Sequence, residues 1–113
     1  MNLINKSLIR GCANITGGGI KDNLERILPS HLSANISLNN IKPNSIFKWI
    51  YEQGITEKEM IKTFNCGVGF CIIIKSKNFN KIKKYFTKNF QPYAIGKIFY
   101  GKKSIDLHGK IKW

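Results

Sequence analysis

The sequence predicts an α+β fold in which a mixed β-sheet packs against helices. Apolar residues at helical spacing alternate along the chain with short β-branched runs. The chain has 113 residues, 42% of them hydrophobic, which is enough for one domain with one modest core. No internal repeat or low-complexity linker interrupts this order. We therefore expect a single domain over residues 1–113.

The first elements are expected to surround a glycine-rich loop. Residues 3–10 resemble the tail of a helix, which Gly11 would end because glycine accepts the left-handed conformation found there. The loop occupies residues 16–19 and leads into a short helix at 20–28, and a strand follows near 33–37.

Two helices are predicted in the middle of the chain, near residues 45–53 and 56–62. Asn44 or Ser45 can cap the first, which Gly54 stops. Thr56 and Glu59 have the spacing of a capping box at the start of the second.

The second half is expected to contain three strands and one helix. Residues 67–75 form the first strand, and the apolar run at 71–74 is typical of a strand buried on both faces. A helix at 78–89 places one apolar stripe on the core. Strands at 92–99 and 105–112 would be joined by a hairpin turn at 101–104. The stripe consists of Phe79, Ile82, Tyr85 and Phe86.

The glycine-rich loop is the first candidate binding site. Gly17, Gly18 and Gly19 follow Thr16 directly and open the short helix. Because glycine has no Cβ, the backbone can turn tightly and bring its N–H groups close to a phosphate, and the positive end of the helix would point at the same place. A plain turn is the alternative, since a glycine triplet alone is a weak signal.

A second polar segment that contains glycines, at residues 63–70, makes the pattern specific. The two segments and their order resemble the C-terminal domain of aminoimidazole ribonucleotide synthetase, also called phosphoribosylformylglycinamidine cyclo-ligase. The resemblance spans nearly the whole chain. It rests on Ile15, Thr16, Gly17, Gly18, Gly19, Asn23, Arg26, Leu28 and Pro29, and on Glu59, Met60, Thr63, Phe64, Asn65, Gly67 and Gly69.

This resemblance implies a purine biosynthetic ligase that closes formylglycinamidine ribonucleotide to aminoimidazole ribonucleotide. It implies ATP and Mg²⁺, both bound mainly by an N-terminal half that we expect to be absent from this chain. The implied partners are that N-terminal half, a phosphoribosyl substrate and a second copy in a homodimer.

The resemblance also implies which residues contact the substrate or its phosphate. Thr16, the three glycines after it, Asn65 and Gly67 would line the cleft between the two halves. Asn65 can equally serve to fix the loop backbone, and Arg26 can satisfy carbonyl groups of its own helix.

Two departures from the family pattern bear on activity. Asn14 replaces the family's histidine, and asparagine does not titrate near neutral pH. No catalytic residue is therefore assigned. The missing half leaves no convincing pair of acidic residues for Mg²⁺. A non-catalytic remnant of the enzyme is the alternative function.

The formal net charge of +13 raises a third interpretation, a basic nucleic-acid-binding module. Seventeen of the nineteen basic residues are lysines spread along the chain, while arginine, which suits base recognition, is nearly absent. A solvated basic surface that attracts an anionic substrate is favoured over nucleic-acid binding.

The remaining residues indicate neither a metal site nor membrane insertion. Cys12, Cys66 and Cys71 form no C-x-x-C pair, and His31 and His108 have no ligand partner at a suitable spacing. No apolar run approaches the ~20 residues of a membrane-spanning helix. We expect a cytoplasmic protein with no metal held by this chain.

Overall fold

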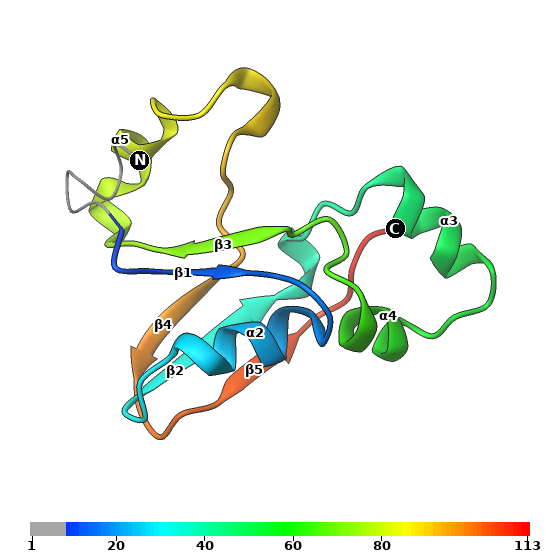
Figure 1. Cartoon of the computed structure of the whole chain (residues 1–113), viewed down its shortest axis with the longest axis horizontal. Coiled ribbons are helices and arrows are strands. Elements are labelled where there is room, and N and C mark those ends of the chain that lie inside the picture. Colours follow the sequence, from blue (N-terminus) through cyan, green and yellow to red (C-terminus); the bar gives the residue numbers. More distant parts are fainter. Residues whose placement is uncertain (1–8) are drawn as a thin grey trace.

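The computed structural model describes residues 9–113 of the chain. The predicted helix at 3–10 falls mainly outside these residues, and Ile9 and Arg10 are not helical. The mixture of strands and helices confirms the predicted α+β class (Figure 1). In chain order the main elements are β1 (Gly11–Asn14), α2 (Gly19–Ile27), β2 (Leu32–Ser37), α3 (Ser45–Glu52), α4 (Glu57–Thr63), β3 (Phe70–Ile73), α5 (Phe79–Lys83), β4 (Gly96–Tyr100) and β5 (Ile105–His108).

The strands form two sheets where the sequence predicted one. β1 and β3 make a two-stranded antiparallel sheet, in which Asn14 lies opposite Phe70. The other sheet has the order β4-β2-β5, with β4 antiparallel and β5 parallel to β2, so it is the mixed sheet that was expected.

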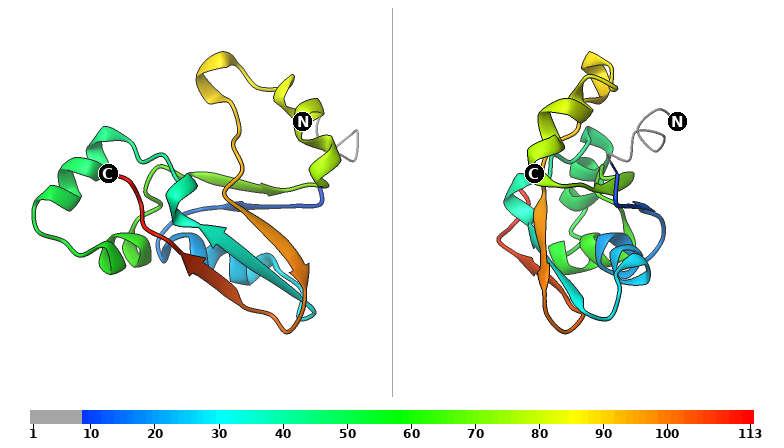
Figure 2. Two further views of the ribbon diagram at one scale, coloured as in Figure 1. Left: turned by 180° about the vertical axis from the view of Figure 1, so that it is seen from behind. Right: turned by 90° about the vertical axis from the view of Figure 1, so that its left-hand side faces the viewer.

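Helix α2 covers one face of the three-stranded sheet (Figure 2). Ala34 and Ile36 of β2 point into the core, and Asn35 between them is exposed on the other face of the strand. Ile20 and Leu24 of α2 are buried in the same core, which also includes Met60 of α4. This core holds α2 in place, and α2 in turn fixes the glycine loop that precedes it.

The predicted hairpin at 101–104 is wrong, because β2 lies between β4 and β5. The link instead passes over the start of β2: Gly101 N–H donates to the His31 carbonyl at 3.0 Å, and Ala34 N–H donates to the Ser104 carbonyl at 2.9 Å. The chain does change direction between β4 and β5, but these two strands pair with β2 and not with each other.

Strand β1 was not predicted, and β3 is shorter than the expected 67–75. A four-residue strand shows little alternation, and β1 exists because β3 pairs with it. β3 begins late because Cys66 and Gly67 have positive φ values of 53° and 93°, which place a turn there. The burial on both faces expected for residues 71–74 is also wrong, since all four residues are only half-buried.

The two central helices agree with the prediction to within one residue at each end. The Thr56 side chain accepts a hydrogen bond from Glu59 N–H at 3.2 Å, which is the backbone half of the expected capping box. Glu59 itself accepts from the Thr63 hydroxyl at 2.7 Å.

Helix α5 is shorter than the predicted 78–89. Of the two strands after it, β4 begins later than the predicted 92–99, and β5 ends earlier than the predicted 105–112. The Gln91 amide donates to the carbonyls of Phe86 and Thr87 at 2.8 and 3.1 Å, which stabilises a non-helical path after the helix. Of the predicted apolar stripe, only Ile82 is buried, and it is not part of the main core. β4 starts only at Gly96, after Pro92, and Gly109, with φ +77°, ends β5.

Candidate functional site

The two glycine-containing segments of the sequence lie side by side in the structure. Ile15 N–H donates to the Gly69 carbonyl at 2.9 Å, which extends the pairing of β1 and β3 by one residue. The Asn65 amide donates to the Ile15 carbonyl at 3.4 Å. Residues 15–19 and 65–69, which we call the paired loops, are therefore one structural unit although 50 residues separate them.

Asn23 braces the first loop from inside. It is 5% exposed, and its amide donates to the Gly19 carbonyl at 2.6 Å and to the Thr16 and Gly17 carbonyls at 3.4 Å each. Its Oδ1 atom accepts from the Thr16 hydroxyl, also at 3.4 Å. One buried side chain thus holds the backbone on both sides of the turn.

Gly19 occupies the inward end of the first loop. Its φ is +71°, and a Cβ atom there would overlap the carbonyl oxygen of Ile61 near the end of α4. Its N–H donates to the Thr16 carbonyl at 3.1 Å, so this group is already bonded within the turn. Gly19 therefore serves close packing of α2 against α4, whatever the loop binds.

The second loop is a turn that its own asparagine closes. Asn65 Oδ1 accepts from Gly67 N–H at 2.9 Å, an arrangement that substitutes for a backbone turn bond. Gly67 has φ +93° and lies against Asn44 and Lys42, where a Cβ would be crowded at 3.1–3.2 Å. Both polar groups of the Asn65 side chain are thus bonded to loop backbone.

Cys66, between these residues, points inward. It is 1% exposed and its Sγ lies 3.5 Å from the Met60 carbonyl. Burial, with a smaller contribution from Glu57, raises the pKa of the Cys66 thiol to about 11. A protonated, buried thiol is a packing group and a poor nucleophile.

The outward side of the paired loops is open. Thr16 and Gly17 are exposed, and a Cβ on Gly17 would meet no atom within 4 Å. Gly69 is exposed with the same free space. Backbone that is braced from below and bare above is suited to close contact with a ligand.

The charges near the loop make this outward side a better place for an anion than the N-terminal end of α2. Asp22 lies in the first turn of α2, and its carboxylate packs against Gly18, where it interacts favourably with the positive end of the helix. An anion directly on the helix N-terminus would meet this carboxylate. Of the predicted phosphate contacts, Thr16 and Gly17 are therefore the residues best placed, while Gly18 is covered.

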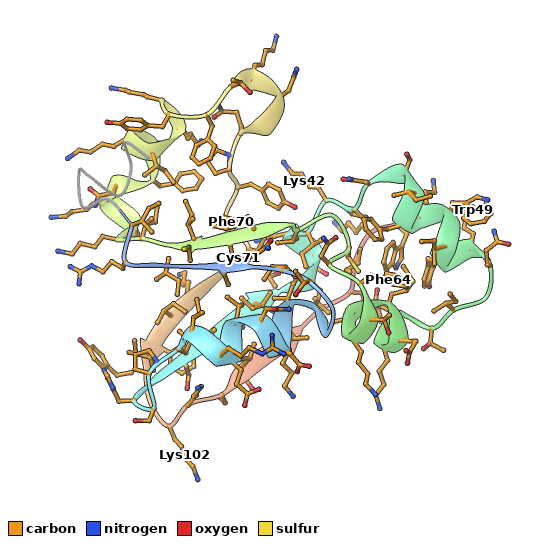
Figure 3. The ribbon with its side chains drawn as sticks, viewed as in Figure 1. Lys42, Trp49, Phe64, Phe70, Cys71 and Lys102 are labelled. Atoms are coloured by element: carbon orange, nitrogen blue, oxygen red, sulfur yellow. The ribbon has the colours of Figure 1, made fainter. Side chains whose placement is uncertain are left out.

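Asn14 lies at the edge of the same site. It is exposed at the end of β1, beside the loop, and Phe70 lies opposite it in β3 with 55% of its surface exposed (Figure 3 labels Phe70). Arg26 points elsewhere: it lines a shallow hollow with Asp22, Glu25 and Lys103 between α2 and the link from β4 to β5. That hollow mixes both signs of charge and does not resemble a phosphate site.

Metal ligands do not gather in the described part of the chain. Within residues 9–113, no three side chains of His, Cys, Asp or Glu come close enough to hold an ion. His31 stacks on Tyr100 with ring centroids 6.4 Å apart, and His108 is exposed on β5. No helix in these residues is long and apolar enough to cross a membrane.

Sequence reasoning found the loops but did not assign Asn23 to the site. Asn23 is one of the residues on which the resemblance rests, yet nothing in its local sequence shows that its side chain would fold back over the loop. The signal that was available is its spacing of four to seven residues from the loop carbonyls, which a helix places on one side.

A sequence model of one protein family matches residues 1–107, and the family is described as AIR synthase related protein, C-terminal domain. The chain belongs to this family. A phosphoribosylformylglycinamidine cyclo-ligase of Carboxydothermus hydrogenoformans is 40% identical over 110 residues, which cover 96% of this chain and 32% of that protein. The enzyme of the same name from Methylobacillus flagellatus is 36% identical over 100 residues, covering 87% of this chain and 29% of that protein.

As a member of the AIR synthase related family, the chain spans about a third of the length of the curated relatives that it matches. The resemblance identified from the two glycine segments is confirmed. The paired loops lie within the region that the family model matches, and the bond from Asn65 to Ile15 connects them.

Proposed function

We propose that this chain is the substrate-side part of a phosphoribosylformylglycinamidine cyclo-ligase, which closes formylglycinamidine ribonucleotide to aminoimidazole ribonucleotide with ATP. The observation that carries the proposal is the construction of the paired loops. Their inward sides are braced by Asn23 and Asn65, while Thr16 and Gly17 are left bare on the surface. The family relationship supplies the reaction.

In this reaction the formyl oxygen of the substrate is phosphorylated, an internal nitrogen attacks the same carbon, and the oxygen leaves as phosphate. The protein has to position the substrate and stabilise phosphate charge. We assign this to the Thr16 hydroxyl and the Gly17 backbone, with Gly18, Gly19, Asn65 and Gly67 shaping the loops. The net charge of +13 attracts the anionic substrate.

The nucleotide and Mg²⁺ are assigned to the part of the enzyme outside this chain. The described residues do not bring together three side chains of His, Cys, Asp or Glu that could hold a metal ion. The complete enzyme would be a cytoplasmic homodimer that contains the N-terminal half as well as this segment.

A second candidate, a non-catalytic remnant, is favoured by one observation. Asn14 is exposed beside Thr16 at the position where the family pattern has histidine. Asparagine can donate a hydrogen bond but cannot take up or release a proton near neutral pH. If the reaction needs proton transfer at this position, the chain keeps the structure of the paired loops but has lost the activity.

The test is a chimera in which this chain replaces the matched 110 residues of the Carboxydothermus enzyme. ATP-dependent formation of the ring product is measured. We expect turnover, and we expect Gly17→Ala to lower kcat/KM at least about tenfold, because its new methyl group can obstruct only an approaching ligand. The matched control is Gly101→Ala, whose Cβ has ordinary contacts of 3.6 Å or more in the link that follows β4 of the three-stranded sheet.

Other outcomes of the same assay separate the two candidates. A folded but inactive chimera that Asn14→His activates would identify the chain as a remnant. A folded chimera that stays inactive with histidine at position 14 would contradict the cyclo-ligase assignment altogether.

A further inference from the structure

Among the helices of the described residues, α3 carries the two large apolar side chains that are more than half exposed, Ile46 and Trp49. Five of its eight residues are apolar or aromatic, yet none is buried. Ile46 is 55% exposed and Trp49 is 59% exposed, and because they are three residues apart they share one side of the helix. We call these two side chains the α3 outer face, and Figure 3 shows Trp49 pointing away from the molecule.

The opposite side of α3 is already occupied by residues of the same chain. The ring of Phe47 packs against Phe64 with centroids 6.0 Å apart, and Tyr51 stacks on Trp113 at 4.6 Å with an angle of 10° between the rings. Trp113 is fixed in turn by the Glu57 carboxylate, which accepts from its Nε1 at 3.2 Å. α3 therefore cannot turn its outer face inward without losing these contacts.

A helix that is apolar on two sides normally has partners on both. We propose that the α3 outer face is the docking surface for the part of the cyclo-ligase that lies outside this chain. This inference rests on the proposed function. The matched relatives are about three times as long as the region they share with this chain, so a large folded region is available to cover the face.

Charge argues against a second copy of this chain as the occupant. Each copy carries a formal charge of +13, so two copies repel each other at moderate ionic strength. A partner that complements this chain has an apolar pocket for Trp49, surrounded by acidic residues. Tryptophan in such a pocket is a common anchor of protein interfaces.

The experiment uses this chain with an affinity tag, coexpressed with the part of the Carboxydothermus enzyme outside the matched 110 residues. The amount of that part recovered with the tagged chain is compared among variants. We expect Trp49→Lys and Ile46→Lys each to reduce recovery at least tenfold, and Trp49→Phe to keep most of it. The matched control is Tyr100→Lys, which places the same charge on an 87% exposed aromatic residue at the end of β4 and should have no effect.

Thermal unfolding of each variant chain alone tests whether a reduced recovery reflects lost docking and not lost folding. Both side chains are more than half exposed, so the lysine variants should unfold within a few degrees of the native chain. If the lysine variants recover as much of the partner as the native chain does, the proposed docking surface is wrong. The proposed function would still stand if the chimera is active. Self-association of the native chain that Trp49→Lys abolishes would assign the face to a second copy and would also overturn the proposal.

Discussion

The inward and outward sides of the paired loops differ in what their residues contact. Inward, Gly19 lies against the Ile61 carbonyl, and Asn23 and Cys66 are buried. Outward, Thr16, Gly17 and Gly69 are exposed, and neither glycine has a neighbour that a Cβ would touch. A single glycine-rich signature therefore combines positions that the fold requires with positions that only a ligand can require. Substitutions on the two sides should separate these requirements.

The largest effect is expected on the inward side, for Gly19→Ala. The substitution forces a positive φ on a residue with a side chain and drives its Cβ into the backbone of α4. These two costs together should lower the free energy of unfolding by about 3 kcal/mol or more. Urea unfolding monitored by circular dichroism measures the change. A loss below about 1 kcal/mol would mean that α2 and α4 are not packed as described.

Asn23→Ala is expected to have the next largest effect. It removes the buried amide that donates to the Gly19 carbonyl at 2.6 Å and to the Thr16 and Gly17 carbonyls at 3.4 Å each. The expected loss of unfolding free energy is about 1–3 kcal/mol. Asn80→Ala, on the exposed side of α5, is the matched control and should change stability by less than about 0.5 kcal/mol. Equal effects of the two substitutions would remove the bracing role of Asn23.

A smaller, pH-dependent effect is expected from Cys66. Its thiol has a pKa of about 11 in the folded chain against the ordinary 9.0, so the unfolded state loses its proton first. Stability from this group is complete below pH 9 and is lost as the pH rises toward 11, by about 1 kcal/mol at pH 10. Cys66→Ala should make the decline between pH 8.5 and 10 shallower, whereas Cys12→Ala, at an exposed thiol, should not. Parallel declines in all three chains would contradict a buried thiol.

The sequence predicted the elements that are determined locally. Thr56 and Glu59 set the start of α4, and the strand expected near residues 33–37 is β2. Strand β1 and the middle position of β2 in its sheet depend on pairing between distant segments. No local pattern contains that information, which is why the expected hairpin at 101–104 failed.

The candidate site was predictable to a similar extent. The two glycine-containing segments indicated where the paired loops are, because Thr16, Gly17 and Asn65 are among the residues on which the resemblance to the family rests. Which of these residues face outward could not be predicted. Asn65 and Gly67 are bonded to each other within the turn at 2.9 Å, while Gly19 is turned inward by its packing against Ile61, which lies 42 residues further along the chain.

The smallest change in stability is expected on the outward side, for Gly17→Ala. The φ of Gly17 is not positive, and a Cβ there has free space, so alanine adopts the same backbone without strain. Because alanine also restricts the unfolded chain, the free energy of unfolding should stay within about 0.5 kcal/mol or rise slightly. The same urea titration as for Gly19→Ala measures it. A loss comparable to that of Gly19→Ala would show that both glycines serve the fold, and the distinction between the two sides of the loop would then fail.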